Sequence, residues 1–174
     1  MTSGPDNRLD AIYRAYLAAI NAAEKRIWLT TPYFVPTEAA LAALTNASLR
    51  GVDVCILVPK KSDSALVTAA ARSYFDELIR CGVRIYEYAA SMLHSKTLVV
   101  DDNLAIIGTA NFDYRSFFLN YEVCVMGYGP DLNHALSQQF QVDLKNSLAV
   151  PYKSEKRFFR RVFDSAARLT SPLL

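Results

Sequence analysis

Cysteine is scarce in this sequence, which has only three cysteines among 174 residues. They are widely spaced and odd in number, and no CxxC pair occurs, which argues against a disulfide framework and against a cysteine zinc site. Each cysteine lies in or beside an apolar run, so we expect small buried thiols. The three are Cys55, Cys81 and Cys124.

Long apolar runs and an excess of one charge are also lacking. No stretch reaches the roughly 18–20 apolar residues of a membrane-spanning helix, and the polar start MTSGPDNRLD has no apolar signal-peptide core. The net charge is only +2, which argues against a strongly basic nucleic-acid binder. That balance is uneven, because residues 1–150 carry 13 basic and 15 acidic side chains, whereas residues 151–174 carry six and two.

The residues that are present predict a folded domain. Apolar residues make up 52% of the chain and charged residues 21%, which excludes disorder, and the length fits one domain. Periodicity and turn residues predict helices over 8–24, 37–50, 64–80 and 130–147, and strands over 26–36, 52–59, 83–88, 94–100, 104–108 and 120–128. We therefore expect an α/β fold, a mixed β-sheet flanked by helices on both faces. The abrupt turn at residues 3–6 suggests a piece of a longer architecture.

Two histidines stand in different contexts. His134 lies on a predicted helix with only Asp131 to titrate nearby, so we expect a solvated or packed side chain. His94 and Lys96 lie two apart in a predicted strand, so their side chains share a face. Because a buried unpaired lysine is costly, this pair suits a site that receives an anion.

Polar residues downstream of His94 complete a candidate catalytic set. Thr109 and Asn111 follow a short apolar strand, and Asn120 and Glu122 project together from a later one. A carboxylate that accepts the Nδ1 proton of His94 would leave Nε2 as a nucleophile. Asp101 is an odd number of residues from His94, so in a strand its side chain would point to the opposite face. It also lies at a turn, so we expect it to anchor the loop.

Together these residues form the pattern H-x-K-x4-D-x6-G-T-x-N, which resembles the HKD motif of the phospholipase D superfamily. The flanking segments TTPYFVPTEAAL, RGVDVCILVPKKSDS, GTANFDYRSFFLNYE and SPLL resemble the C-terminal half of bacterial cardiolipin synthases, and the resemblance extends across nearly all of the chain. It implies that residues 1–150 form a phospholipase D-like domain with one HKD motif. We expect residues 151–174 to form a basic amphipathic C-terminal helix and tail.

The resemblance implies phosphodiester exchange through a covalent phosphohistidine, without a metal or cofactor. His94 would be nucleophile or general acid, Lys96 and Asn111 would hold the phosphoryl oxygens, and Glu122 would orient His94. Thr109 and Asp101 would be supporting residues. In cardiolipin synthesis the acceptor is the terminal hydroxyl of a second phosphatidylglycerol, and glycerol leaves.

The chain departs from that family in having one HKD motif, whereas full-length enzymes carry two that face each other. His134 does not begin a second motif, because ALSQQF follows it where the motif requires a lysine and an aspartate. We therefore expect either a homodimer with a composite site or a half that pairs with another HKD half. The alternatives are a homodimeric single-motif phosphodiesterase, nuclease or phospholipase D hydrolase, and an inactive half-domain that acts as an interaction module.

Contacts to an anionic phospholipid substrate are expected from Tyr33, Lys60 and Asn120, although a loop lysine is also commonly just solvated. Phe34, Phe117 and Phe118 are either core residues or contacts for acyl chains. Apolar residues recur at helical spacing over 153–170 between arginines, so this segment is either a basic amphipathic helix at an anionic membrane or a helix docked on the domain. The expected location is the cytoplasm or the periphery of the bacterial cell membrane, with nucleic acid not the expected partner.

Overall fold

The computed structural model describes residues 1–6 and 9–152. The amphipathic helix predicted over 153–170 lies outside the described residues, as does nearly all of the predicted tail 151–174. No helix in the described part of the chain is long and apolar enough to cross a membrane.

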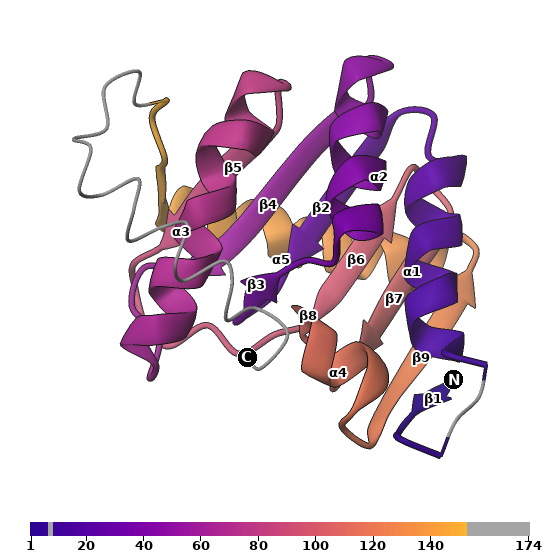
Figure 1. The fold of residues 1–174 in the computed structure, drawn as a ribbon. Helices are drawn as coiled ribbons and strands as arrows, with labels where there is room; N and C mark the ends of the chain where they lie inside the picture. The colour runs from indigo at the N-terminus through magenta and orange to yellow at the C-terminus, as the bar shows by residue number, and fades with distance from the viewer. Residues whose placement is uncertain (7–8, 153–174) are drawn as a thin grey trace.

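In the described residues, eight strands form one mixed sheet in the order β1-β9-β7-β6-β2-β4-β5-β10 (Figure 1). Strands β2, β4 and β5 run parallel, whereas β6, β7 and β9 pair antiparallel from the other side of β2. The strand bounds are β1 Thr2–Ser3, β2 Arg26–Thr30, β4 Asp53–Pro59, β5 Arg84–Tyr88, β6 Thr97–Val100, β7 Leu104–Gly108, β9 Glu122–Tyr128 and β10 Ser147–Ala149. A separate two-stranded ladder pairs β3 Phe34–Val35 with β8 Phe112–Asp113 in parallel.

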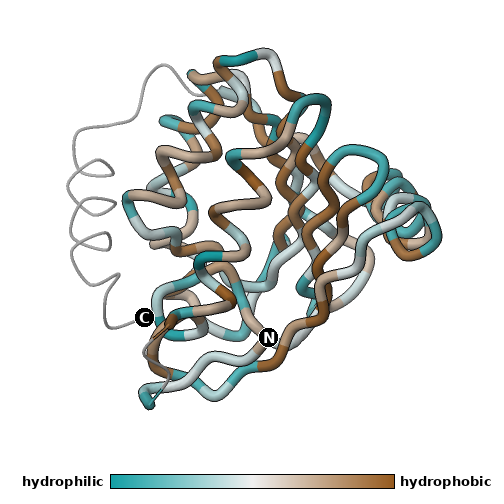
Figure 2. The backbone as a smooth tube through the Cα atoms, turned by 90° about the vertical axis from the view of Figure 1, so that its right-hand side faces the viewer, coloured by the Kyte–Doolittle hydropathy of each residue, from teal (hydrophilic) through white to brown (hydrophobic). Residues whose placement is uncertain are grey.

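Helices cover both faces of the sheet. Three of them, α1 Ala11–Ala22, α2 Glu38–Leu49 and α3 Ala65–Arg80, lie on one face, and α5 Pro130–Lys145 crosses the other (Figure 1). Figure 2 shows the hydrophobic strands between these helical layers. The short helix α4 Tyr114–Phe118 lies at one end of the sheet, next to β8. The predicted α-β-α sandwich with a mixed sheet is confirmed.

Helix starts and stops follow local chemistry. The side chains of Thr37 and Ser64 accept hydrogen bonds from the amides three residues on, at 3.1 and 3.3 Å, and so cap α2 and α3. Gly51 and Gly82 follow the same two helices with φ of +93° and +92°, a conformation that glycine adopts without strain. The side-chain caps fix where α2 and α3 begin, and the glycines fix where the chain leaves them to return to the sheet.

The larger core lies between the sheet and the three helices, and its aromatic part is under α4. Phe34 and Phe112 stack at 5.7 Å, and Phe117 meets Phe112 edge-on at 5.5 Å. Phe34 and Phe117 are almost completely buried, and Phe118 packs partly buried against the same core. These rings are therefore core residues, and the acyl-chain interpretation of Phe34 and Phe117 is wrong.

The cysteines follow the expectation from composition. Cys55 and Cys124 are buried, Cys81 is half-buried, and all three are free thiols. Burial raises the pKa of the Cys55 thiol to about 12, so it is an uncharged core group. The expectation of small buried thiols is confirmed for Cys55 and Cys124.

Candidate active site

The candidate site lies at one edge of the sheet, where several strands begin or end together. The parallel strands β2 and β4 end there, and β6 begins there because Thr30 of β2 pairs antiparallel with Thr97. β7 ends at Gly108 and β9 begins at Glu122 at the same edge. The loops that follow and precede these strand ends carry His94, Lys96, Thr109 and Asn111.

Two predicted strands differ from the structure at this edge. The strand predicted over 26–36 is split, because Pro32 lacks an amide donor and the chain turns there before β3. The strand predicted over 94–100 begins only at Thr97, since β2 has already ended and offers no partner beyond Thr30. His94 and Lys96 thus lie in the segment that leads into β6. The expectation that their side chains share one face of a strand therefore does not apply.

Lys96 is buried at the site, and its side chain is turned toward the histidine. Its exposed fraction is 8%, and its Nζ donates to the main-chain oxygen of His94 at 2.7 Å. Among the described residues Lys96 forms no ion pair within 4 Å. Burial lowers the pKa of Lys96, and the carboxylates of Glu122 and Asp113 oppose that effect. Lys96 is thus a buried amine with one N–H bonded to His94 and two N–H donors without a hydrogen-bond partner among the described residues.

His94 itself is exposed to solvent at this edge of the sheet. In the described part of the chain no hydrogen bond joins it to Glu122, whose carboxylate accepts one from Asn120 Nδ2 at 3.5 Å. The predicted contact between Glu122 and His94 Nδ1 therefore stays a prediction. Asn120 is held by its backbone, which bonds Arg115 and the hydroxyl of Ser3.

Asn111 is fixed by the small β3–β8 ladder. It immediately precedes Phe112, whose amide donates to the Thr31 hydroxyl at 3.0 Å. Its Oδ1 is buried and has no partner among the described residues. A buried polar atom without a partner costs free energy.

Gly108 and Thr109 hold β7 against β9 directly before Asn111. A Cβ on Gly108 would collide with the Val123 carbonyl oxygen and come within 2.7 Å of the Cys124 Cα, so only glycine permits this approach. Thr109 donates its amide to the Val123 oxygen at 2.9 Å, and its hydroxyl accepts from the Val123 amide at 3.0 Å. Thr109 thus lies at the site and holds β7 to β9 through its bonds to the Val123 backbone.

Asp113 is a charged residue of the site region that sequence reasoning missed. It is 2% exposed and caps α4 by accepting the Ser116 amide at 2.7 Å. Burial raises its pKa, while hydrogen bonds from Ser116 and Asn111 act in the opposite sense. The signal in the sequence was an aspartate directly before a short apolar segment, which is a helix-start pattern.

The predicted substrate-binding residues lie on loops at the same edge. Tyr33 follows the turn after β2, and its hydroxyl donates to Asp63 Oδ1 in the loop between β4 and α3. Lys60 begins that loop with an exposed side chain, and its amide bonds the Tyr88 carbonyl at 2.9 Å. Asp63 was missed, although a polar loop after a parallel strand is a frequent ligand-binding position.

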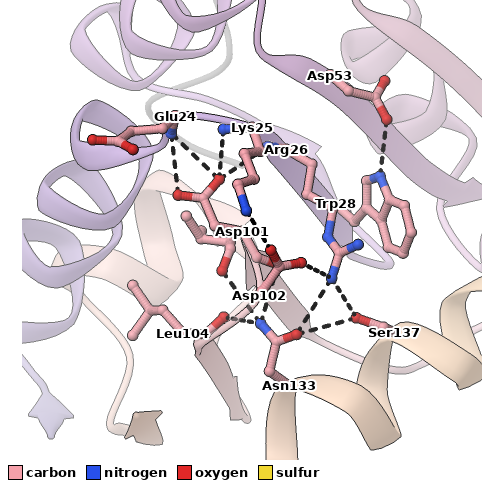
Figure 3. A network of polar contacts seen from close by, with 11 residues as sticks. Glu24, Lys25, Arg26, Trp28, Asp53, Asp101, Asp102, Leu104, Asn133 and Ser137 are labelled. Atoms are coloured by element: carbon pink, nitrogen blue, oxygen red, sulfur yellow. Dashed lines mark hydrogen bonds and ion pairs between the residues drawn. The ribbon is translucent and has the colours of Figure 1, made fainter. Parts of the chain in front are cut away.

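Asp101 lies at the other end of β6, away from His94. Its carboxylate accepts the amides of Glu24, Lys25 and Arg26, the last two at 2.7 and 3.0 Å (Figure 3). Its φ of +50° places it in the left-handed region that aspartate tolerates. The four residues of β6 put about 13 Å between this aspartate and the site edge.

A second group of contacts anchors α5 at that same distant end. Asn133 is buried on α5 and donates to the carbonyls of Val100 and Leu104 at 3.2 and 2.8 Å (Figure 3). Arg26 contacts Asn133 Oδ1 at 3.5 Å and forms an ion pair with Asp102 at 3.2 Å. This end of the sheet is therefore a structural clamp, and the candidate chemistry is at the opposite end.

His134 lies on the exposed surface of α5 and is close to the Gln138 amide, at 2.9 Å. The structure thus places it as a solvated helix residue, apart from the strand edge that carries His94. In the part of the chain that the structure describes, no cluster of three or more histidine, cysteine, aspartate or glutamate residues could hold a metal ion.

Comparisons with known proteins identify the family of the chain. A family model described as "Cardiolipin synthase, PLD-like domain" matches residues 16–144. The whole chain is 47% identical to cardiolipin synthase 2 of Bacillus anthracis and 47% identical to the cardiolipin synthase of Geobacillus kaustophilus. The chain spans about a third of the length of these curated relatives, 34% and 35% respectively.

Solved structures share the fold at lower identity. Nuc, a phospholipase D family member from Salmonella typhimurium, superposes with a TM-score of 0.70 and 23% identity over 79% of this chain and 90% of that one. The phosphatidylserine synthase of Haemophilus influenzae Rd KW20 gives 0.74 and 16% identity over 100% of this chain and 47% of that one. The predicted resemblance is confirmed, and the chain belongs to the family of phospholipase D-like domains found in cardiolipin synthases.

Proposed function

We propose that this domain supplies one HKD half of a metal-independent phosphatidyltransferase that converts two phosphatidylglycerol molecules into cardiolipin and glycerol. The observation that carries the proposal is the buried Lys96, which has no ion-pair partner among the described residues and is bonded to the backbone of His94 at 2.7 Å. A buried ammonium without a counter-ion is costly, and a phosphodiester anion at this position offsets that cost.

In the proposed reaction, Nε2 of His94 attacks the phosphorus of the first phosphatidylglycerol. The bond to the glycerol oxygen breaks, and glycerol leaves with a proton from the facing histidine of the second HKD motif. The hydroxyl of a second phosphatidylglycerol then gives its proton to that histidine and attacks the phosphohistidine, which releases cardiolipin. Splitting one displacement into two lowers each barrier.

The other site residues have defined roles in this scheme. The two free N–H donors of Lys96 and the amide of Asn111 hold the nonbridging phosphoryl oxygens. The side-chain amide of Asn111 uses one hydrogen in a hydrogen bond to Asp113. Its second hydrogen is left to bond the phosphoryl group. Glu122 stabilises the positive charge that develops on His94, and Thr109 fixes the strand that carries Asn111.

The scheme needs two histidines, and this chain supplies only one within an HKD motif. A second HKD half therefore faces the site, either from another copy of this chain or from the longer architecture of which the relatives are examples. Contact of residues 153–170 with an anionic membrane remains part of the proposal, as does a cytoplasmic or peripheral membrane location.

The test uses phosphatidylglycerol vesicles, with product lipids separated and measured by mass spectrometry while the solution mass of the protein is recorded. We expect cardiolipin formation that rises with the dimer fraction. His94→Ala is expected to abolish it, and His134→Ala, which removes the other histidine from an exposed helix position, is expected to leave it unchanged.

Three outcomes would contradict the proposal in different ways. Full activity of a strictly monomeric preparation contradicts the composite site. Release of phosphatidic acid without cardiolipin, or cleavage of single-stranded DNA in a parallel assay, selects a hydrolase or nuclease. Silence at every protein concentration, even with an added HKD half, selects the inactive interaction module.

A further inference from the structure

Tyr33 and Asp63 form a polar pair at the candidate site that the mechanism above leaves unused. The Tyr33 hydroxyl donates to Asp63 Oδ1, which joins the turn after β2 to the loop after β4. β2 and β4 are neighbouring parallel strands, so their C-terminal ends open on the same edge of the sheet. Asp63 is exposed, so Oδ2 of its carboxylate is accessible to a ligand.

The register of the β3–β8 ladder places this pair beside Asn111. Phe34 pairs with Phe112 in parallel, and Tyr33 and Asn111 are the residues directly before this pair. Residues in register share a face, as the stacked rings of Phe34 and Phe112 show. Tyr33 and Asn111 directly precede the two paired strands, so the ladder brings their backbones to the same edge of the sheet.

A hydroxyl bridge holds that arrangement in place. Thr31 Oγ1 accepts the Phe112 amide at 3.0 Å and donates to the Tyr33 carbonyl at 2.8 Å. One side chain thus holds the carbonyl of Tyr33 and the amide directly after Asn111. The backbones of the two polar residues are therefore held by the same hydroxyl group.

The protonation states of the pair are defined at neutral pH. The hydrogen bond to Asp63 raises the pKa of Tyr33 to about 12, so Tyr33 is a hydroxyl donor. The hydrogen bond from Tyr33 lowers the pKa of Asp63, and bonds from backbone amides and the charge of His94 act in the same direction. Asp63 is thus a carboxylate within electrostatic reach of His94.

We propose that the Tyr33–Asp63 pair binds the hydroxyl groups of the glycerol headgroup and so selects an alcohol rather than water as the acceptor. This inference rests on the proposed phosphatidyl transfer and names the determinant of its acceptor. A carboxylate and a phenol oxygen both accept hydrogen bonds from the hydroxyls of a polyol. The negative charge of Asp63 disfavours a second phosphate at this position, whereas the Lys96 end attracts one. Lys96 and the Tyr33–Asp63 pair would therefore bind a phosphoglycerol group in one orientation, with the phosphate at Lys96 and the glycerol hydroxyls at the pair.

The experiment compares two monoanionic phosphodiesters that differ only in their alcohols. Glycerophosphoglycerol is the headgroup diester with glycerol hydroxyls, and dimethyl phosphate lacks them. Affinities for both are measured by NMR titration of the full chain and of the variants Asp63→Asn and Tyr33→Phe. Asp131→Asn is the matched control, because it removes one exposed carboxylate at the start of α5.

We expect the wild-type chain and Asp131→Asn to prefer glycerophosphoglycerol by a similar ratio. Asp63→Asn is expected to reduce that ratio about tenfold, which corresponds to about 1.4 kcal/mol, and Tyr33→Phe by a smaller factor. Binding of dimethyl phosphate is expected to stay the same or to strengthen in Asp63→Asn, because a negative charge near the anion is removed. That result is not produced by general damage to the fold, which weakens both ligands.

Each contrary outcome has a distinct meaning. An unchanged affinity ratio in Asp63→Asn overturns the inference. A wild-type chain that binds both diesters equally also overturns it, while the phosphoryl site of the proposed function stands. A wild-type chain that binds neither diester contradicts the proposed function, and the inference falls with it.

Discussion

Replacing Asp101 tests whether the aspartate of the HKD motif serves the fold or the reaction. Its carboxylate accepts three successive backbone amides at the start of β2, from Glu24, Lys25 and Arg26. It also adopts a left-handed conformation with φ of +50°. Both features belong to the end of β6 opposite His94, so the substitution is expected to change stability without changing ligand binding.

The magnitude of the Asp101→Ala effect follows from those contacts. Hydrogen bonds to a charged group contribute about 1.5–3 kcal/mol each, but water replaces the exposed ones, so the three together give about 2–3 kcal/mol. Alanine at a positive φ adds about 1 kcal/mol. The expected loss in the free energy of unfolding is about 3–4 kcal/mol, which lowers the Tm by roughly 10 °C for a chain of this size.

Urea unfolding followed by the fluorescence of Trp28, the only tryptophan of the chain, measures this loss on β2 itself. Asp101→Asn is the graded control, because asparagine tolerates the left-handed region and keeps one acceptor oxygen, so about half the loss is expected. Dimethyl phosphate binding by the folded variants is expected to match that of the wild type. Stability within about 0.5 kcal/mol of wild type for Asp101→Ala, or lost binding in a fully stable variant, would refute the reasoning.

Further predictions concern the site edge and the core beneath it. Gly108→Ala is expected to cost about 2 kcal/mol or more in urea unfolding, because its Cβ meets the backbone of Val123 and Cys124, and a loss below about 0.5 kcal/mol would contradict the close approach. Phe117→Ala is expected to cost about 3–5 kcal/mol by the same measurement. Burial lowers the pKa of Lys96, and this residue holds an anion only when protonated, so phosphodiester affinity is expected to fall as the pH rises through that lowered pKa. Lys96→Arg is expected to remove this pH dependence, because arginine stays protonated, and an unchanged pH profile would count against Lys96 as the anion ligand.

Much of the sheet could be predicted because its buried strands read as short β-branched apolar runs between turn residues. Segments such as VDVCILVP and LAIIG carry that signal locally. The β3–β8 ladder could not be predicted, because it joins Phe34 and Phe112 across 78 positions and each strand has only two residues. Pro32 and Pro36 were both expected to end the run over 26–36, and β2 ends before Pro32 while β3 ends before Pro36.

The candidate site was predictable where it depends on the motif and less so where it depends on three-dimensional contacts. His94, Lys96 and Asn111 follow from the spacing, and the structure brings their segments to one edge of the sheet. The bond from Lys96 to the His94 carbonyl has no sequence signature, because it requires the segment before β6 to leave the strand. Asp63 was missed because its partner Tyr33 is 30 positions away, whereas Asp113 carried a local helix-start signal through its contact with the Ser116 amide.

The β3–β8 ladder has a consequence for how insertions and deletions act in this domain. Directly before each of its strands stands a polar residue of the candidate site, Tyr33 before Phe34 and Asn111 before Phe112, and both phenylalanines are buried. Both residues of each strand are buried, so a shift of one residue would move the phenylalanine out of the ring stack and bring Tyr33 or Asn111 into a buried position. A single inserted or deleted residue in either strand would therefore destroy the catalytic edge and the folded core together, so variation in chain length is confined to the loops on either side.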